Sequence, residues 1–130
     1  SSTNDRIADW VLAYATPSST EADAAEAMEA AASFRPFPID HHLRLTYNYS
    51  VGHVLLLTGD FQQASVHLGR AANSCHAVRY PLEHTRAILE YGQSLERMRR
   101  RVDACDAYRR VVDRWAKGNS RSAQYASARM

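Results

Sequence analysis

Several features that would narrow the function quickly are scarce or missing in this sequence of 130 residues. No apolar run approaches the roughly 20 residues that a membrane-spanning helix needs, and no signal-peptide pattern opens the chain. The two cysteines, Cys75 and Cys105, are too few for a disulfide framework and lack the CxxC spacing of a metal or redox motif. We therefore expect no membrane contact, thiols in a reducing compartment and a cytoplasmic location.

Net charge is also small, at +2, although charge is distributed unevenly along the chain. Acidic residues dominate the first 40 positions, whereas basic residues dominate from Arg86 to Arg129 and include the run RMRRR at 97–101. The apolar fraction of 45% is ordinary for a globular protein, so we expect one domain with a packed core. Because the chain starts at Ser1 and stops at Met130 inside an expected helix, we also expect a processed product or a piece of a longer protein.

Proline and glycine cluster between stretches of helical periodicity, and long strand-like alternation is absent. Ser18 and Glu21 have the spacing of a capping box before the second stretch, and Asp60 can cap the fourth. The pattern predicts an all-α chain with helices over residues 4–15, 20–34, 41–58, 60–77, 82–98, 102–115 and 122–130.

Pairs of small residues twelve positions apart recur along the chain: Gly52 with Ala64, Gly92 with Ala104 and, less clearly, Ala13 with Ala25. Glycine inside a helix costs about 1 kcal/mol relative to alanine, so glycines at matching positions need a structural reason. Antiparallel helices that cross closely supply one, because small side chains let the two backbones approach. We therefore expect hairpins of two helices that repeat along the chain.

One unit of this pattern resembles the tetratricopeptide repeat, through Gly52, Leu55, Gly59, Phe61, Ala64, Leu68 and Ala71. The next unit, with Gly92, Leu95, Ala104, Tyr108 and Val111, resembles it less fully because arginines replace the glycine of the turn. The resemblance implies one domain over 1–130, with units over about 4–35, 41–78 and 82–117 and a partial capping helix over 120–130. The implied fold is all-α, with about three antiparallel helix-turn-helix hairpins stacked as a short right-handed TPR-like α-solenoid. The offsets of 39 and 40 residues exceed the family's usual 34, which predicts longer helices or links.

There is also a narrower resemblance. Repeat regions appended to bacterial serine/threonine protein kinases are similar to the segments SCHAV, HTRAILEYGQSLE and ACDAYRRVVDRW. The glycine-rich nucleotide loop, HRD and DFG of the kinases themselves are absent from the sequence. This resemblance implies a docking or sensing segment of a bacterial signalling protein, without catalysis of its own.

The tetratricopeptide pattern also implies which side chains face a concave groove. These candidates for peptide or partner binding are Tyr49, Ser50 and His53 on one helix and Arg86, Glu90, Gln93 and Arg97 on another, with Thr46, Leu89, Trp10 and Tyr14 as further candidates. The Asn and Lys residues by which some family members hold a peptide carboxylate are missing, and we do not expect a chaperone-tail binder. The expected function is a non-catalytic protein-interaction module. The alternative is a self-assembling repeat protein in which a second copy of the chain is the partner.

No catalytic or cofactor-binding constellation stands out, so we expect neither an enzyme nor a bound cofactor. The six histidines form no i, i+4 pair and no HExxH motif, which favours surface or helix-packing roles over metal binding. Assembly of a zinc site from Cys75, His76 and a distant residue stays open, as does a Cys75–Cys105 disulfide. Cys105 near a helix start could be an activated thiol, although helix packing explains it better.

The RMRRR run at 97–101 admits three interpretations, which are a solvated turn, contact with an acidic protein and contact with nucleic acid. Arg109, Arg110 and Arg114 could extend a basic patch, but Glu96, Asp103 and Asp106 flank it. A solvated turn is therefore the favoured interpretation and nucleic acid the least favoured.

Overall fold

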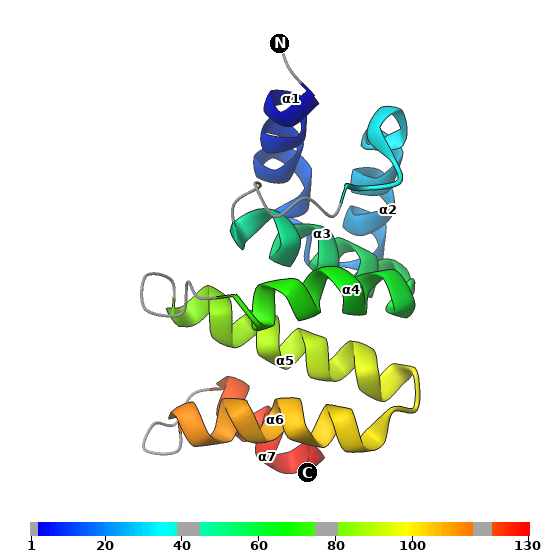
Figure 1. Cartoon of the computed structure of the whole chain (residues 1–130). Helices are drawn as coiled ribbons and strands as arrows, with labels where there is room; N and C mark the ends of the chain where they lie inside the picture. Colours follow the sequence, from blue (N-terminus) through cyan, green and yellow to red (C-terminus); the bar gives the residue numbers. More distant parts are fainter. Residues whose placement is uncertain (1–2, 39–44, 75–80, 116–120) are drawn as a thin grey trace.

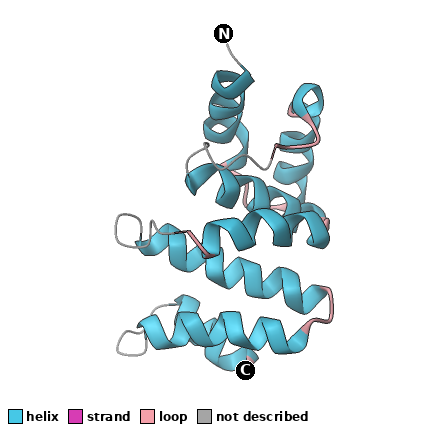
Figure 2. Cartoon of the chain, viewed as in Figure 1, coloured by secondary structure: helices cyan, strands magenta, loops and turns pink. Residues whose placement is uncertain are grey.

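The computed structural model describes residues 3–38, 45–74, 81–115 and 121–130, and over these residues it contains helices and turns but no strand (Figures 1 and 2). The helices are α1 (Thr3–Trp10), α2 (Glu21–Ala30), α3 (Leu45–Thr58), α4 (Phe61–Ala72), α5 (Pro81–Arg97), α6 (Arg101–Trp115) and α7 (Arg121–Arg129). A π-helical turn, η1 (Val11–Ala15), continues α1, and a 3₁₀ turn, η2 (Ala32–Phe34), follows α2. The predicted all-α class is confirmed.

The helices from α3 onward lie in successive layers, and α1 and α2 stand at a steep angle to them (Figure 1). Along the chain, α3, α4, α5, α6 and α7 each pack against the next helix. In addition, α3 touches α5 and α5 touches α7, so alternate helices share one side of the stack. The buried apolar side chains form one core within α1–α4, a second that covers α5–α7 and reaches Ala72 on α4, and a small third cluster of Ala71 and Ala87 between α4 and α5.

The turn from α3 to α4 follows the sequence prediction. Gly59 has φ +89°, a left-handed conformation that glycine adopts without strain. The Asp60 side chain then accepts the backbone N–H of Gln63 and caps α4, as expected. This helix ends at Ala72, short of the predicted residue 77, and residues 75–80 lie outside the described part.

The predicted capping box before α2 is wrong. Thr20 is the cap, in an extended conformation at φ −124° and ψ 165°, and its hydroxyl accepts from the backbone N–H of Asp23. The Ser18 hydroxyl instead donates backward to the carbonyl of Tyr14 at 2.6 Å. The reason is that α2 begins at Glu21, which places Asp23 rather than Glu21 at the third helical position.

The close helix crossings predicted from the glycines are confirmed. A Cβ atom on Gly52 would lie 2.5 Å from Leu68 Cγ on α4, and one on Gly92 would lie 2.7 Å from Tyr108 Cε1 on α6. These distances are far below van der Waals contact, so a side chain at either position would force its neighbour to shift. Ala64 and Ala104, from the same pattern, are buried at 0% and 2% exposure. The two crossings occur at positions 40 residues apart on both helices.

The turn from α5 to α6 repeats the turn from α3 to α4 despite its different sequence. Asp60 N–H donates to the Leu55 carbonyl at 3.0 Å, and Arg100 N–H donates to the Leu95 carbonyl at 2.9 Å. Arg99 occupies the place of Gly59 with φ 63°, which is unusual for a residue with a side chain. The arginine-rich turn thus preserves the backbone geometry although it lacks the glycine.

The first hairpin does not share this pattern. Ala13 and Ala25, the weakest of the small-residue pairs, are both exposed, so this match is wrong. The buried alanines are Ala15, Ala24 and Ala27, and the last of these accepts a 2.7 Å hydrogen bond from the Trp10 indole N–H through its carbonyl. A large indole between the helices replaces the close approach of two small residues, and the hairpin packs differently.

Candidate functional site

Three residues expected to face a partner meet between α3 and α5. Tyr49 and His53 lie one turn apart on α3, with ring centroids 5.8 Å apart in a stacked arrangement. The Tyr49 hydroxyl donates to Glu90 Oε2 at 2.5 Å, and His53 Nδ1 lies 2.5 Å from Glu90 Oε1. The carboxylate on α5 therefore holds both rings on α3.

The second ring nitrogen of His53 points to another part of the chain. Nε2 lies 2.8 Å from the carbonyl oxygen of Ser18, in the link between α1 and α2. A carbonyl oxygen and a carboxylate oxygen both only accept hydrogen bonds, so both ring nitrogens must carry a hydrogen. The geometry therefore describes an imidazolium paired with a carboxylate, with side chains only 22% and 13% exposed.

The pKa values in this cluster follow from these contacts. Burial lowers the pKa of His53, but the hydrogen bond to Glu90, the charge of Glu90 and the Ser18 carbonyl outweigh burial and raise it above its usual value. Burial and the carboxylate raise the pKa of the Tyr49 hydroxyl, which keeps it a hydrogen-bond donor. Neither His53 nitrogen is left to take a proton from a substrate, so the cluster ties three segments together instead of providing a base.

The other candidates on α5 are more accessible. Arg86 and Arg97 are exposed and Gln93 is half-buried, and helical spacing puts all three on the same side of α5 as Glu90. The Arg97 guanidinium lies over the Phe61 ring, 4.8 Å from its centroid. These three side chains form what we call the α5 face.

Several other candidates are placed in the core instead. Ser50 is only 5% exposed, which corrects its assignment to a groove because α3 turns it toward the packed side. Trp10 is buried beside Phe37, with ring centroids 5.0 Å apart, and is likewise a core residue. Leu89 is half-buried and packs against the second core. Tyr14, in contrast, is 39% exposed. The side chain of Thr46 lies outside the described part.

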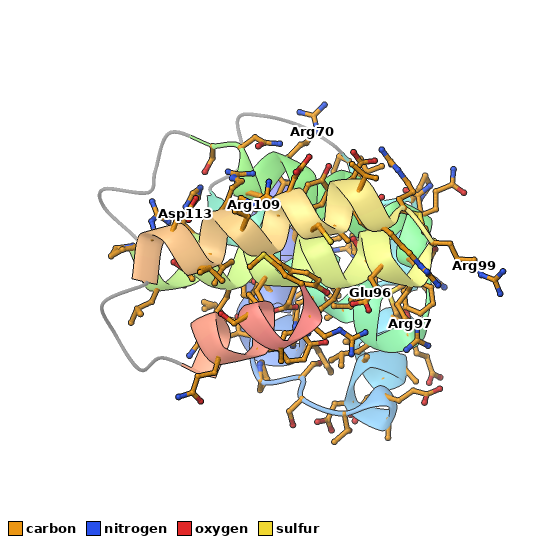
Figure 3. All side chains as sticks on the ribbon, turned by 90° about the horizontal axis from the view of Figure 1, so that it is seen from below. Arg70, Glu96, Arg97, Arg99, Arg109 and Asp113 are labelled. Atoms are coloured by element: carbon orange, nitrogen blue, oxygen red, sulfur yellow. The ribbon has the colours of Figure 1, made fainter. Side chains whose placement is uncertain are left out.

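The arginine run divides among different roles (Figure 3). Arg100 pairs with Asp103 at 2.9 Å, and Arg97 belongs to the α5 face. Arg99 extends away from the helices at the turn, and Arg109 on α6 pairs with Asp106 at 3.5 Å. This arrangement matches a solvated turn with mixed charges better than one continuous basic patch.

The remaining groups bear on three other possibilities, which are a metal site, a membrane span and cysteine chemistry. Over the described ranges, no group of three or more His, Cys, Asp or Glu side chains is placed to hold a metal ion, and no helix is long and apolar enough to cross a membrane. Cys105 is half-buried. Cys75 and His76 lie outside the described residues, so the zinc and disulfide hypotheses involving them stay untested.

Of the histidines that the structure describes, His67 and His84 are buried, and His84 satisfies a carbonyl at the end of α4. His84 Nε2 donates to the carbonyl of Ala72 at 2.8 Å, and its Nδ1 accepts from Arg114 at 2.6 Å. Arg110 donates to the same Ala72 carbonyl at 2.8 Å and to the Asn73 side chain at 3.2 Å. The end of α4 is thus satisfied by side chains from α5 and α6, which the spacing along the chain does not reveal.

No family model, no curated protein and no solved structure matches this chain.

Proposed function

We propose that this chain is a non-catalytic interaction module of the tetratricopeptide kind, which binds a peptide or a partner helix on the α5 face. The observation that carries the proposal is the repetition of the α3–α4 unit as α5–α6. Three features recur 40 residues later: the glycine at the helix crossing, the hydrogen bonds of the turn and the left-handed residue in the turn. Helical units that repeat in this way stack into arrays that offer an extended surface to a partner.

The positive charge of the α5 face favours an acidic partner. Arg86 and Arg97 are exposed, and Glu90, an acid on their side of the helix, is already bound to Tyr49 and His53. An acidic peptide or helix would meet two guanidinium groups suited to carboxylates, with Gln93 between them as an amide donor and acceptor. The resemblance to kinase-appended repeats supports a docking role in a bacterial signalling protein.

The test is a selection of random peptides displayed on phage against the immobilised chain, followed by fluorescence anisotropy with each selected peptide. Replacing Arg86, Gln93 and Arg97 together by alanine should weaken binding at least tenfold, or about 1.4 kcal/mol. The matched control replaces Arg70 and Arg109, which removes the same charge elsewhere on the surface and should leave binding unchanged. If the wild type, the triple variant and the control bind with equal affinity, and circular dichroism shows that all three keep their helicity, the α5 face is not the binding surface.

Self-assembly is the second candidate, favoured by large apolar side chains on the surface. Leu12, Leu82 and Val102 are 73%, 64% and 76% exposed. Light scattering after size exclusion, over a hundredfold concentration range, distinguishes the candidates. A rising mass that Val102→Ser or Leu82→Ser reverses would favour assembly, whereas a constant monomer mass would favour a separate partner. Nucleic-acid contact through 97–101 would instead appear as strongly salt-dependent RNA or DNA binding.

A further inference from the structure

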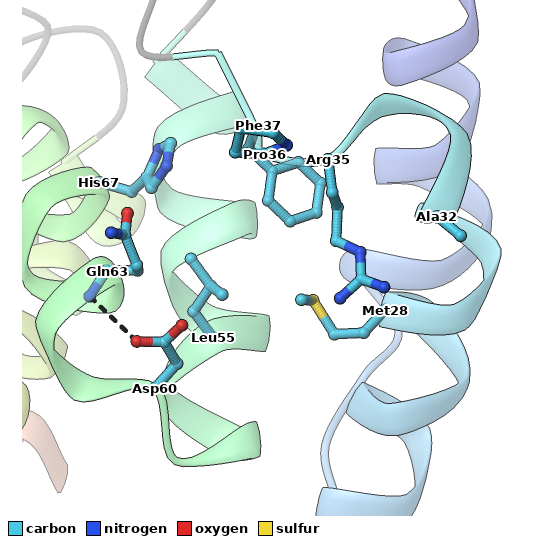
Figure 4. A pocket seen from close by; sticks show the side chains of 9 residues that line it. All are labelled: Met28, Ala32, Arg35, Pro36, Phe37, Leu55, Asp60, Gln63 and His67. Atoms are coloured by element: carbon cyan, nitrogen blue, oxygen red, sulfur yellow. Dashed lines mark hydrogen bonds between the residues drawn. The ribbon is translucent and has the colours of Figure 1, made fainter.

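A cavity of about 500 Å³ lies between the end of α2 and the start of α4 (Figure 4). It is lined by Met28, Ala32, Arg35, Pro36, Phe37, Leu55, Asp60, Gln63 and His67. Its α2 side belongs to the part of the chain that stands at a steep angle to the layers below (Figure 1). Its volume is within the range of small-ligand sites, and its mixture of apolar walls with a few polar groups is typical of them.

The two sides of the cavity carry opposite charge. Figure 4 shows the Arg35 guanidinium beside Met28 on the α2 side and the Asp60 carboxylate beside Leu55 on the α4 side. Asp60 Oδ1 accepts the Gln63 backbone N–H, and its other oxygen is directed toward the cavity. Within the described part of the chain, neither charge has an ion-pair partner. Both residues are exposed, so a ligand can reach them from solvent.

The α4 wall also holds the imidazole of His67. His67 is 1% exposed, and its Nδ1 lies 3.0 Å from Asn48 Oδ1, which can only accept. Nδ1 therefore carries the hydrogen. Burial, aided by the charge of Arg70, lowers the pKa of His67 to about 4, so the ring stays neutral.

We propose that this cavity binds a short peptide segment, held by its apolar side chains and by charges at its two ends. Its cationic end meets Asp60 and its carboxylate meets Arg35. The apolar body lies on Met28, Phe37 and Leu55. A free amino acid fits less well, because its ammonium and carboxylate share one carbon, whereas the two protein charges lie on opposite walls. Each further residue separates the ends by about 3.3–3.6 Å.

The experiment is isothermal titration of the whole chain with leucyl-leucine, its N-acetyl form, its C-terminal amide and free leucine. We expect leucyl-leucine to bind and each of the other three to bind at least tenfold more weakly. Asp60→Asn should abolish the preference for a free amino end, and it retains the cap of α4 because asparagine caps as well as aspartate. Arg35→Gln should abolish the preference for a free carboxylate, while the control Arg109→Gln should change neither.

A second titration distinguishes a free peptide from a segment of a protein. A peptide Lys-Leu-Leu-Glu with both ends blocked carries the same charges on side chains. Tighter binding than leucyl-leucine, again dependent on Arg35 and Asp60, would support the site and assign its ligand to a protein segment. Weaker binding would assign it to free peptides. Absence of heat with every probe, or binding that neither variant changes, would overturn the proposal. Because the α5 face is not involved, its triple variant should bind these probes normally.

Discussion

His53 and Glu90 form a 2.5 Å hydrogen bond that ties α3 to α5, and the other nitrogen of the same ring reaches Ser18 before α2. One imidazolium therefore connects the first hairpin to the repeated units that follow. Because both contacts need a hydrogen on nitrogen, the connection is complete only while His53 is protonated. The groups facing it are Tyr49 on α3, with Glu90 and Arg86 on α5.

Stability should therefore decrease as pH rises above neutrality. The folded-state pKa of His53 is raised above 6.5, so its contribution is complete below pH 6.5 and is lost as pH passes through the folded-state pKa. The buried His67 and His84 act in the opposite direction, because their lowered pKa values remove stability as pH falls below 6.5. Urea unfolding across pH 5 to 9 should show maximal stability near pH 6.5.

The variant His53→Gln isolates the alkaline part of this profile. At pH 6 it should lose about 1–3 kcal/mol, the usual cost when a buried charged group loses its hydrogen-bond partner. Its stability should then no longer depend on pH above 6.5, whereas the acid side, set by His67 and His84, should be unchanged. An alkaline decrease identical to that of the wild type would assign the effect to another group.

Gly52→Ala and Gly92→Ala should each destabilise the fold. The new methyl groups would lie 2.5 Å from Leu68 Cγ and 2.7 Å from Tyr108 Cε1, and overpacking of this kind costs about 1–3 kcal/mol. Gly69→Ala is the matched control, because its nearest neighbour, Tyr91 Cε1, is 3.1 Å away and can shift. The better helix propensity of alanine, about 1 kcal/mol, should leave that variant close to wild type. Equal unfolding midpoints for all three would refute tight crossings at Gly52 and Gly92.

Local chemistry made much of this fold predictable. The Gly59-Asp60 turn, the cap on α4 and the glycine crossings each depend on residues close in sequence or on a short repeat. Turn geometry was harder to foresee where the signal is weak, as at Arg99, because an arginine normally avoids a positive φ. The helix cap before α2 was assigned wrongly for a similar reason. The sequence pattern does not fix the first residue of a helix, and a start two residues later makes Thr20 the cap in place of Ser18.

The site depends on contacts between distant segments, and only part of it was predictable. The tetratricopeptide resemblance placed Tyr49, His53 and Glu90 among the candidates for one groove, but it did not show that they bind one another. It also did not show that His53 reaches Ser18, because that contact depends on the angle of the first hairpin. The cavity could not be predicted for the same reason, since Arg35 and Asp60 reach it from segments that are far apart in the sequence.

Arg110→Ala should destabilise the protein, and the neighbouring Arg109→Ala should not. Arg110 donates to the Ala72 carbonyl and the Asn73 side chain at the end of α4, where a positive charge also complements the helix dipole. Its loss should cost about 1–2 kcal/mol in chemical unfolding. Arg109 makes one exposed ion pair with Asp106, and such pairs contribute about 0–1 kcal/mol. Similar costs for the two variants would show that α4 does not depend on this contact.

Arg99→Gly should stabilise the protein although it removes a whole side chain. Arg99 has φ 63°, and a left-handed conformation costs a residue with a Cβ about 1–2 kcal/mol. Its side chain extends into solvent, so little is lost with it (Figure 3). We expect a gain of about 0.5–1 kcal/mol, reduced from the full strain because glycine gains more freedom on unfolding. Gly59→Arg, at the equivalent turn, should lose a similar amount, since nothing lies within 4 Å of its Cβ position and only backbone strain acts. Opposite shifts in unfolding midpoint would establish that the two turns are equivalent, whereas destabilisation by Arg99→Gly would show that the arginine side chain itself holds the second turn.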